Sequence, residues 1–302
     1  MNVLFCNNPL DTKKVDPDFE SEFLAAEESG FITLFLNYEV LTIDEDAFQS
    51  IKKIKANDSI QEIIYRGWML KPRHYQSLYT ALLSKNYKLI NNPSEYQNCH
   101  YLPDSYEYIR SKTPKTIWFK LENGLPDFDT ILAGIKQFGS SSLIVKDFVK
   151  SQKHYWDTAC FIPSASDIDH VKKVINNFIL LQGSDLNEGV VLREFVELKD
   201  LTNHSKSGMP LKLEYRLFFY KKKLVACYNY WEEGIYASEG NLPIDYFSKI
   251  ALEIESNFFT MDVAQTQKGE WIIIELGDGQ VAGIPANDSD NEFYQNLSRI
   301  IL

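Results

Sequence analysis

The sequence predicts a protein of the mixed α/β and α+β class, and two patterns support this prediction. Strand-like apolar runs alternate with helix-like runs over the first hundred residues, which favours a largely parallel sheet covered by helices. Beyond residue 113, strand-like runs also follow one another directly, and short turns at 221–223 and 268–269 join two pairs of them. Such turns are typical of antiparallel hairpins. We therefore expect an α/β domain followed by an α+β domain.

The predicted first domain, residues 1–112, is small and of the α/β type. Its expected strands are 1–7, 31–37, 61–66 and 87–91, and its expected helices are 19–29, 44–55 and 73–85. Residues 91–114 are rich in Asn, Pro, Ser and Tyr and show no steady period. We interpret them as the connection to the second domain.

The predicted second domain, residues 113–302, is of the α+β type. Its expected strands are 116–122, 142–148, 189–198, 213–220 and 224–231, followed by the two arms of a hairpin within 258–283. Its expected helices are 127–139, 167–182 and 243–258. Gly139 ends the first of them, apolar residues at helical spacing mark the second, and Pro243 suits the first turn of the third.

Composition and charge exclude several classes of protein. The 302 residues are 44% hydrophobic and 24% charged, which excludes a largely disordered chain. The net charge of −11 repels phosphate backbones, so long nucleic acid is disfavoured as a partner. No apolar run approaches the ~20 residues of a membrane span, and the N-terminus lacks signal-peptide features. The cysteines lack metal-ligand spacing, so we expect reduced thiols and a cytoplasmic protein that does not enter the membrane.

Two carboxylates near the C-terminus, Asp262 and Glu275, lie in apolar runs joined by a turn that contains Lys268 and Gly269. If these two turn residues form the whole loop, the carboxylates pair directly across the hairpin, about 5 Å apart. Like charges at that distance repel, which suggests a compensating cation, most simply a divalent one. The alternative is a solvated surface pair, and an odd-length loop would place the two side chains on different faces.

A lysine and a basic loop form a second candidate site. Lys146 ends the apolar run 143–145, and the loop after it carries Lys150, Lys153 and His154. The ammonium groups and the loop N–H groups together could hold phosphates. The alternative is an ordinary basic loop with no ligand.

Two later segments complete the set. The stretch Glu194–Glu197 follows an apolar strand, and its backbone could offer a donor and an acceptor to a nucleotide base. Arg216 shares a strand face with Glu214 and could neutralise a phosphoryl group. Each of these charged residues could instead form a cross-strand salt bridge. Arg66 ends the strand 61–66, at the edge of a parallel sheet where ligands gather, and a terminal salt bridge is again the alternative.

The order of these features resembles the ATP-grasp superfamily. Residues 113–285 contain, in this order, a strand that ends in a lysine, a basic loop, a backbone hinge, a strand that carries an arginine, and a final Asp and Glu. More narrowly, the strings YRGW, IVKDFVKSQKHYW, EYRLFF and IIELGDGQVAGIP are similar to a bacterial and phage clade named for two arginines and one lysine. The resemblance implies an ATP-grasp fold with two lobes around the nucleotide, preceded by a small α/β domain.

The resemblance also implies roles for individual residues and the cofactors ATP and Mg²⁺. Those implied to bind the nucleotide are Lys146, Lys150, Lys153, Glu194, Val196, Glu197 and Arg216, with the hinge holding adenine. Asp262 and Glu275 are implied to hold Mg²⁺. Many members end with Glu-x-Asn, whereas this chain has Gly277 at the asparagine position, so Asp278 or Gln280 is the candidate replacement.

The activity implied by the resemblance is that of an ATP-dependent ligase. Such an enzyme phosphorylates a substrate carboxylate and joins the acyl group to an amine of an amino acid, peptide or small metabolite. Arg66 is the candidate for binding the substrate carboxylate, and Trp68, Tyr230 and Trp231 are candidates for lining the acceptor pocket. The alternatives are a kinase or nucleotidyl transferase at the same site, or a scaffold that binds nucleotide without turnover. A homodimer is the default expectation for the oligomeric state.

Overall fold

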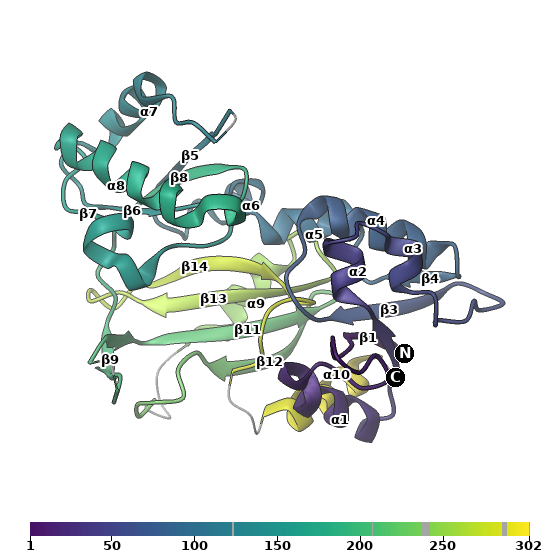
Figure 1. Ribbon diagram of the computed structural model, residues 1–302. Coiled ribbons are helices and arrows are strands. Elements are labelled where there is room, and N and C mark those ends of the chain that lie inside the picture. The colour runs from purple at the N-terminus through teal and green to yellow at the C-terminus, as the bar shows by residue number, and fades with distance from the viewer. Residues whose placement is uncertain (123, 207, 237–241, 286–288, 302) are drawn as a thin grey trace. The chain divides into compact units, whose positions relative to one another are not determined.

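The computed structural model describes the whole chain except residues 123, 207, 237–241, 286–288 and 302 (Figure 1). The described residues form two compact units. The first unit contains residues 1–99, 200–263 and 276–302, and the second contains residues 100–199 and 264–275. The C-terminal half of the chain contributes to both units, and the domain boundary at 112/113 stays a prediction.

The first unit contains a parallel sheet with the strand order β2-β1-β3-β4. Its strands are β1 (Asn2–Cys6), β2 (Ile32–Leu36), β3 (Gln61–Arg66) and β4 (Tyr87–Leu89). The helices from this part of the chain are η1 (Pro17–Phe19), α1 (Glu20–Glu28), α2 (Tyr38–Thr42), α3 (Ala47–Ser50), α4 (Pro72–Leu83) and α5 (Pro93–His100). The parallel α/β arrangement expected for the first hundred residues is therefore confirmed.

Helix α3 differs from the prediction, because the expected helix 44–55 is reduced to a single turn. The side chain of Asp46 caps this turn by accepting a hydrogen bond from the Gln49 N–H at 2.9 Å. A capping aspartate marks the first residue outside a helix, so Asp46 excludes the preceding residues.

A second sheet has the strand order β12-β11-β13-β14. Its strands are β11 (Glu214–Tyr220), β12 (Lys223–Asn229), β13 (Phe258–Gln265) and β14 (Trp271–Asp278), and the last two run through both units. The turn between β11 and β12 consists of Lys221 and Lys222, both with positive φ, which is typical of a tight two-residue hairpin. The same region also contains β9 (Asp200–Asn203), β10 (Pro210–Lys212), α9 (Ile244–Ala251) and α10 (Ser289–Ile301).

One apolar core joins distant parts of the chain within the first unit. It includes Val3 and Phe5 from β1, Phe218 from β11, Phe258 from β13 and Phe293 from α10. Helices α1 and α10, coloured purple and yellow in Figure 1, lie side by side although they come from opposite ends of the sequence. This shared core explains why residues 1–99 do not form a unit of their own.

The second unit contains an antiparallel sheet with the order β5-β8-β6-β7. Its strands are β5 (Thr116–Lys120), β6 (Leu143–Lys146), β7 (Phe161–Ile162) and β8 (Gly189–Glu194). Its helices are α6 (Leu102–Ile109), α7 (Phe128–Ile135), η2 (Lys136–Phe138), η3 (Lys153–Tyr155), the π-helical turn η4 (Trp156–Cys160), α8 (Ile168–Gln182) and η5 (Gly183–Asp185). The predicted helix 167–182 is confirmed, with Asp167 as its cap.

Two other expectations for the helices need correction. Residues 91–114, interpreted as an irregular connection, contain α5 and α6. The expected helix 243–258 ends at Ala251. Among the helices that the structure describes, none is long and apolar enough to cross a membrane.

Candidate functional site

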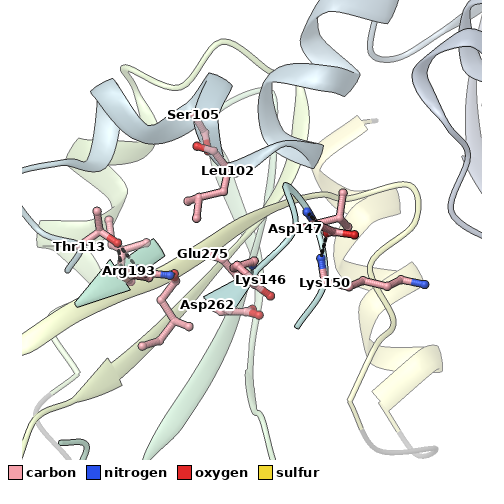
Figure 2. A network of polar contacts seen from close by, with 12 residues as sticks. Leu102, Ser105, Thr113, Lys146, Asp147, Lys150, Arg193, Asp262 and Glu275 are labelled. Carbon is pink, nitrogen blue, oxygen red and sulfur yellow. Dashed lines mark hydrogen bonds and ion pairs between the residues drawn. The ribbon is translucent and has the colours of Figure 1, made fainter. Parts of the chain in front are cut away.

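The second unit brings together two of the predicted site residues, Lys146 and Glu275. Lys146 is the last residue of β6 and is 7% exposed, and its Nζ donates to Glu275 Oε2 at 3.0 Å. Figure 2 shows the two side chains pointing toward each other. The Glu275 side chain remains 36% exposed, so one end of this ion pair is open to solvent. The predicted phosphate lysine and one predicted metal ligand are therefore neighbours.

The turn after Lys146 is organised by Asp147, a residue that the sequence analysis missed. Asp147 is fully buried, and its Oδ1 accepts from the N–H groups of Val149 and Lys150 at 2.6 and 2.5 Å. Its Oδ2 accepts from the side chains of Gln182 and Asn187 at 2.9 and 3.0 Å. An aspartate followed by a turn often binds the N–H groups two and three residues on, and this signal could have revealed it.

This turn corrects one detail of the predicted phosphate cradle. The N–H groups of Val149 and Lys150 already bind Asp147 and are not available to a phosphate. The side chains of Lys150 and Lys153 are exposed. Any phosphate contact from this loop would therefore come from the lysine ammonium groups rather than from these two backbone groups.

Arg193 is a second residue that the sequence analysis did not assign to the site. It lies on β8, is 7% exposed, and donates to the carbonyl oxygens of Ile273 and Ile274 and to Thr113 Oγ1. Burial lowers the pKa of its guanidinium to about 10, and the nearby charge of Glu275 partly opposes that shift. Its Nε has no hydrogen-bond partner among the residues that the structure describes.

His100 is also buried in this part of the second unit. Burial lowers the pKa of its imidazole to about 4, and the charge of Lys150 lowers it further, whereas Glu275 acts in the opposite direction. The imidazole is therefore neutral near pH 7 and adds no charge to the surroundings of Lys146 and Glu275.

The predicted hinge follows the end of β8. The Glu194 N–H donates to the Lys115 carbonyl, and the Phe195 N–H donates to the Ser142 carbonyl, both at 2.8 Å. At the other end, the carbonyl of Glu197, whose side chain is exposed, accepts from the Gln267 N–H at 3.0 Å. Within the described parts of the chain, the N–H and C=O of Val196 form no hydrogen bond. The hinge is thus held on both sides, while its central peptide groups remain open to a ligand.

The first unit joins two further predicted residues, Arg216 of β11 and Asp262 of β13. The Arg216 Nε donates to Asp262 Oδ1 at 2.8 Å and its second terminal nitrogen donates to Oδ2 at 2.7 Å, which makes the pair bidentate. The remaining nitrogen donates to the Gly283 carbonyl at 2.9 Å, and the guanidinium lies 5.0 Å from the ring centre of Tyr230. The Asp262 side chain is 4% exposed and that of Arg216 is 16% exposed.

The turn between β13 and β14 differs from the predicted two-residue loop. The Thr266 N–H donates to the Glu270 carbonyl, and the Gly269 N–H donates to the Thr266 carbonyl, so the loop contains three residues and ends in Gly269 at positive φ. At the far end of the strands, the Gly279 N–H donates to the Phe258 carbonyl at 3.0 Å, in the predicted register. Between these two points the second arm, residues 270–279, contains one residue more than the first arm, residues 258–266, which corresponds to a β-bulge.

At the far end of this hairpin, Gly277 lies close to the side chain of Thr260. A side-chain carbon added to Gly277 would lie 2.7 Å from Thr260 Oγ1, so Thr260 fills the space beside this glycine. The two residues share a face, as the predicted register requires. The direct pairing of Asp262 with Glu275 stays a prediction, because the bulge lies at an unassigned place between the two ends.

Asp278, the predicted replacement for the missing asparagine ligand, is fully buried. Its oxygens accept from the Asn91 side chain at 2.6 Å and from the Gln280 N–H at 2.9 Å, and burial raises its pKa to about 7. It lies three positions after Glu275, so in a regular strand the two side chains point to opposite faces. This burial argues against the predicted metal role of Asp278. Gln280 is equally buried and binds Tyr75 and Tyr65.

Arg66, the predicted ligand of a substrate carboxylate, is 1% exposed. It forms a bidentate ion pair with Glu22 at 2.8 and 2.6 Å, and its remaining nitrogen donates to the carbonyls of Gly279 and Ala282. A substrate carboxylate would have to displace Glu22 from the core. The geometry therefore favours a structural role for Arg66.

The other predicted side chains are less decisive. Trp68 is 41% exposed, and its Nε1 donates to Asp16 at 2.9 Å. Trp231 lies 5.0 Å from Tyr230, which packs on Arg216. His154 is exposed in η3. The predicted contact of Trp68, Tyr230 and Trp231 with an acceptor stays a prediction.

The residues that the structure describes contain no group of three or more His, Cys, Asp or Glu side chains that could hold a metal ion. Mg²⁺ commonly binds one or two protein carboxylates together with substrate phosphates and water, rather than a cage of protein ligands. Asp262 accepts hydrogen bonds from Arg216, and Glu275 accepts one from Lys146, so each carboxylate holds a cation that a bound phosphate could take over. The donor set therefore fits Mg²⁺ that arrives with phosphates.

Comparison with known families supports the resemblance found in the sequence. Residues 134–297 match the profile of an ATP-grasp domain, family 3 of the clade named for two arginines and one lysine. The chain belongs to this family. The clade is the same one that the short sequence strings resemble. A comparison with curated protein sequences finds no match.

Solved structures with low sequence identity show the same fold. A RimK-domain ATP-grasp protein from Sphaerobacter thermophilus aligns with a TM-score of 0.60 and 11% identity, over 99% of this chain and 98% of that one. D-Cycloserine synthetase DcsG aligns with a TM-score of 0.60 and 13% identity over 100% of both chains. The ATP-grasp ligase PsnB, solved with a minimal precursor, Mg and ADP, aligns with a TM-score of 0.53 and 12% identity over 99% and 96%. The predicted ATP-grasp fold is therefore confirmed.

Proposed function

We propose that this protein is an ATP-dependent ligase that activates a carboxylate as an acyl phosphate and joins it to an amine. The observation that carries the proposal is the pairing of predicted phosphate-binding cations with predicted metal-binding carboxylates. Lys146 binds Glu275, and Arg216 binds Asp262. In each pair, a bound phosphate could pair with the lysine or arginine, and a bound metal ion could pair with the carboxylate. The similarity of the fold to the ligase PsnB, which has been solved with Mg and ADP, agrees with this proposal.

In the proposed complex, the second unit supplies most contacts to the nucleotide. The N–H and C=O of Val196 are free to bind the base, and Glu194 and Glu197 hold the chain on either side of it. Lys146 would leave Glu275 for a phosphate oxygen, and the exposed Lys150 and Lys153 would add charge from the loop. These contacts orient the triphosphate without any covalent step by the protein.

Asp262 and Glu275 would hold Mg²⁺ in this complex. When bound, the metal ion neutralises charge on the β- and γ-phosphates. Arg216 lies beside Asp262 and would stabilise the negative charge on the transferring phosphoryl group.

Phosphoryl transfer depends on positioning and charge neutralisation more than on a protein nucleophile, which suits a site built from cations and carboxylates. A substrate carboxylate oxygen attacks the γ-phosphorus and ADP leaves. The amine then attacks the acyl carbon, a proton leaves the nitrogen, and inorganic phosphate departs with the oxygen that attacked.

Product analysis tests the proposal. The purified protein is incubated with Mg²⁺, ATP and pools of amino acids and peptides, and the products are identified by mass spectrometry. The expected products are ADP, phosphate and a condensed amide in equal amounts, with none of the three formed by Lys146→Ala. AMP as a product would indicate nucleotidyl transfer, and a stable phosphorylated acceptor would indicate a kinase. Either result would overturn the ligase assignment.

A further inference from the structure

Two buried cations of the second unit, Lys146 and Arg193, act on the carboxylate of Glu275. Lys146 and Arg193 are cations, both 7% exposed, and Glu275 is a carboxylate. The Lys146 charge is matched by Glu275 at 3.0 Å. Among the described residues, Arg193 forms no ion pair within 4.0 Å. A buried cation without a paired carboxylate is costly, so its retention calls for an explanation.

The hydrogen bonds of Arg193 do not neutralise its charge. Its terminal nitrogens donate to two carbonyl oxygens, of Ile273 and Ile274, and to the hydroxyl of Thr113, all of which are neutral groups. Its Nε is buried and has no partner within the described part of the chain. Neutral acceptors therefore fix the orientation of the guanidinium, and its positive charge is not cancelled by any of them.

Glu275 feels this charge in two ways. Arg193 binds the carbonyl of Ile274, the residue directly before Glu275, and so fixes the backbone from which the carboxylate projects. The charges of Arg193 and Glu275 also attract each other. Glu275 therefore faces two buried cations, Lys146 and Arg193, whose positive charge would oppose a metal ion that approached the carboxylate without a phosphate. A phosphate would reverse that balance.

We propose that Arg193 is a positioning residue that makes metal binding at Glu275 conditional on bound nucleotide. The inference rests on the proposed function, since it assumes that Glu275 is a metal ligand and that Lys146 binds phosphate. Arg193 favours the anionic nucleotide and disfavours the free cation. Binding of ADP supplies the negative charge that lets Glu275 accept the metal ion.

The test measures two affinities separately, with Mn²⁺ standing in for Mg²⁺ because both prefer octahedral oxygen ligands. ADP binding is measured by calorimetry in the presence of a chelator, and Mn²⁺ binding is measured by electron paramagnetic resonance with and without ADP. In the wild-type protein, we expect ADP to tighten Mn²⁺ binding by roughly 10-fold or more, within the usual range of coupling between sites.

Two substitutions separate charge from geometry. Arg193→Gln keeps a donor for the Ile274 carbonyl but removes the charge. We expect about 10-fold weaker ADP binding without metal and tighter Mn²⁺ binding without ADP, so that the coupling shrinks. Arg193→Lys keeps the charge but loses the planar fork, and we expect it to retain most of the coupling. A merely structural role would weaken both ligands in both variants.

Thr113→Val is the matched control, because it removes a neutral partner of Arg193 with little change of shape. We expect its coupling to stay within about 2-fold of the wild-type value. A second control, Arg193→Gln combined with Glu275→Gln, should lose the gain in Mn²⁺ binding if that gain arises at Glu275.

The outcomes distinguish this inference from the proposed function. If wild-type protein binds ADP and Mn²⁺ with strong coupling and Arg193→Gln leaves that coupling unchanged, the role of Arg193 is refuted and the nucleotide site stands. If the wild-type protein binds no nucleotide, both proposals fail.

Discussion

Two arginine–carboxylate pairs of the first unit have the same chemistry and different surroundings. Arg66 with Glu22 and Arg216 with Asp262 are both bidentate, and each arginine also binds backbone carbonyls of the segment 279–283. The side chain of Arg66 is 2% exposed, whereas that of Arg216 is 16% exposed. The carboxylates follow the reverse order, since the Glu22 side chain is 11% exposed and that of Asp262 is 4% exposed, so a ligand can reach the second pair through its guanidinium. Burial of the arginine, rather than residue type, separates a structural pair from a candidate functional pair.

The largest expected effect comes from breaking the pair of Arg66 and Glu22. Arg66→Met leaves Glu22 as a buried carboxylate without its cation, and we expect the free energy of unfolding to fall by about 3–5 kcal/mol. Denaturant unfolding followed by circular dichroism measures this. The double variant Arg66→Met, Glu22→Leu should recover part of the loss. If Arg66→Met kept wild-type stability but lost activity, Arg66 would be the substrate ligand that the sequence predicts.

A second prediction concerns pH and Asp278, another buried carboxylate of the first unit. Burial raises the pKa of Asp278 to about 7 in the folded protein, above its ordinary value in the unfolded chain. Between about pH 4 and pH 7 the folded state therefore binds more protons than the unfolded state, and this group makes stability fall as pH rises. Above pH 7 the loss is complete, at about 2–4 kcal/mol for a shift of this size.

Asp278→Asn should remove this dependence, because an amide does not titrate. Urea unfolding at pH 5 and pH 8 is the measurement, and the stability of the variant relative to wild type should increase between the two values. The matched control is Asp127→Asn, since Asp127 caps α7 at the surface and hydrogen bonds lower its pKa. An equal pH dependence in wild type and Asp278→Asn would contradict the prediction.

A substitution in the pair of Arg216 and Asp262 should reduce activity strongly and stability only slightly, the reverse of a substitution at Arg66. Asp262→Asn keeps the shape but removes the charge that pairs with Arg216 and the proposed metal ion. We expect ATP turnover to fall about 100-fold or more, while the free energy of unfolding falls by only about 1–3 kcal/mol. Single-turnover ADP release at several Mg²⁺ concentrations is the measurement. Turnover that persisted with unchanged Mg²⁺ dependence would refute the assignment of Asp262.

The smallest expected effect lies on the basic loop. The Lys150 side chain is exposed, and its backbone N–H is already held by Asp147, so Lys150→Ala removes one solvated charge and leaves the turn intact. We expect about a 3- to 10-fold increase in the KM for ATP with little change in kcat or stability. Steady-state kinetics at low and high salt would reveal it, and an effect independent of salt would point to a direct contact instead.

Much of the fold was predictable because local patterns agreed with the final structure. The alternation over residues 1–90 depends on neighbours in sequence, as do the helix predicted over 167–182 and the strand predicted over 142–148, which correspond to α8 (Ile168–Gln182) and β6 (Leu143–Lys146). The candidate site residues Lys146, Arg216, Asp262 and Glu275 could be chosen as a set because their order resembles a family to which the chain belongs, and their roles stay a prediction.

Other features depended on contacts that no local pattern contains. The buried turn at Asp147 needs Gln182 and Asn187, which lie 35 and 40 residues away. The hairpin of β13 and β14 has one extra residue in its second arm. This residue shifts the pairing of the two strands near the turn away from the register that a two-residue loop predicts. In the sequence, nothing distinguishes Arg193 from other arginines in strands. Its hydrogen bonds to backbone carbonyls of β14 become visible only in the structure.

The sequence by itself determined the class of fold, the family and the identity of the cations and carboxylates, because periodicity and residue order are properties of the chain alone. Tertiary structure decided which charges are sealed and which are accessible. It removed Arg66 and Asp278 from the solvent, paired Lys146 with Glu275, and left Arg193 as a buried cation held by neutral groups. The physical reason is that desolvation and partner geometry, which set the energy of a charge, depend on residues that are distant in sequence.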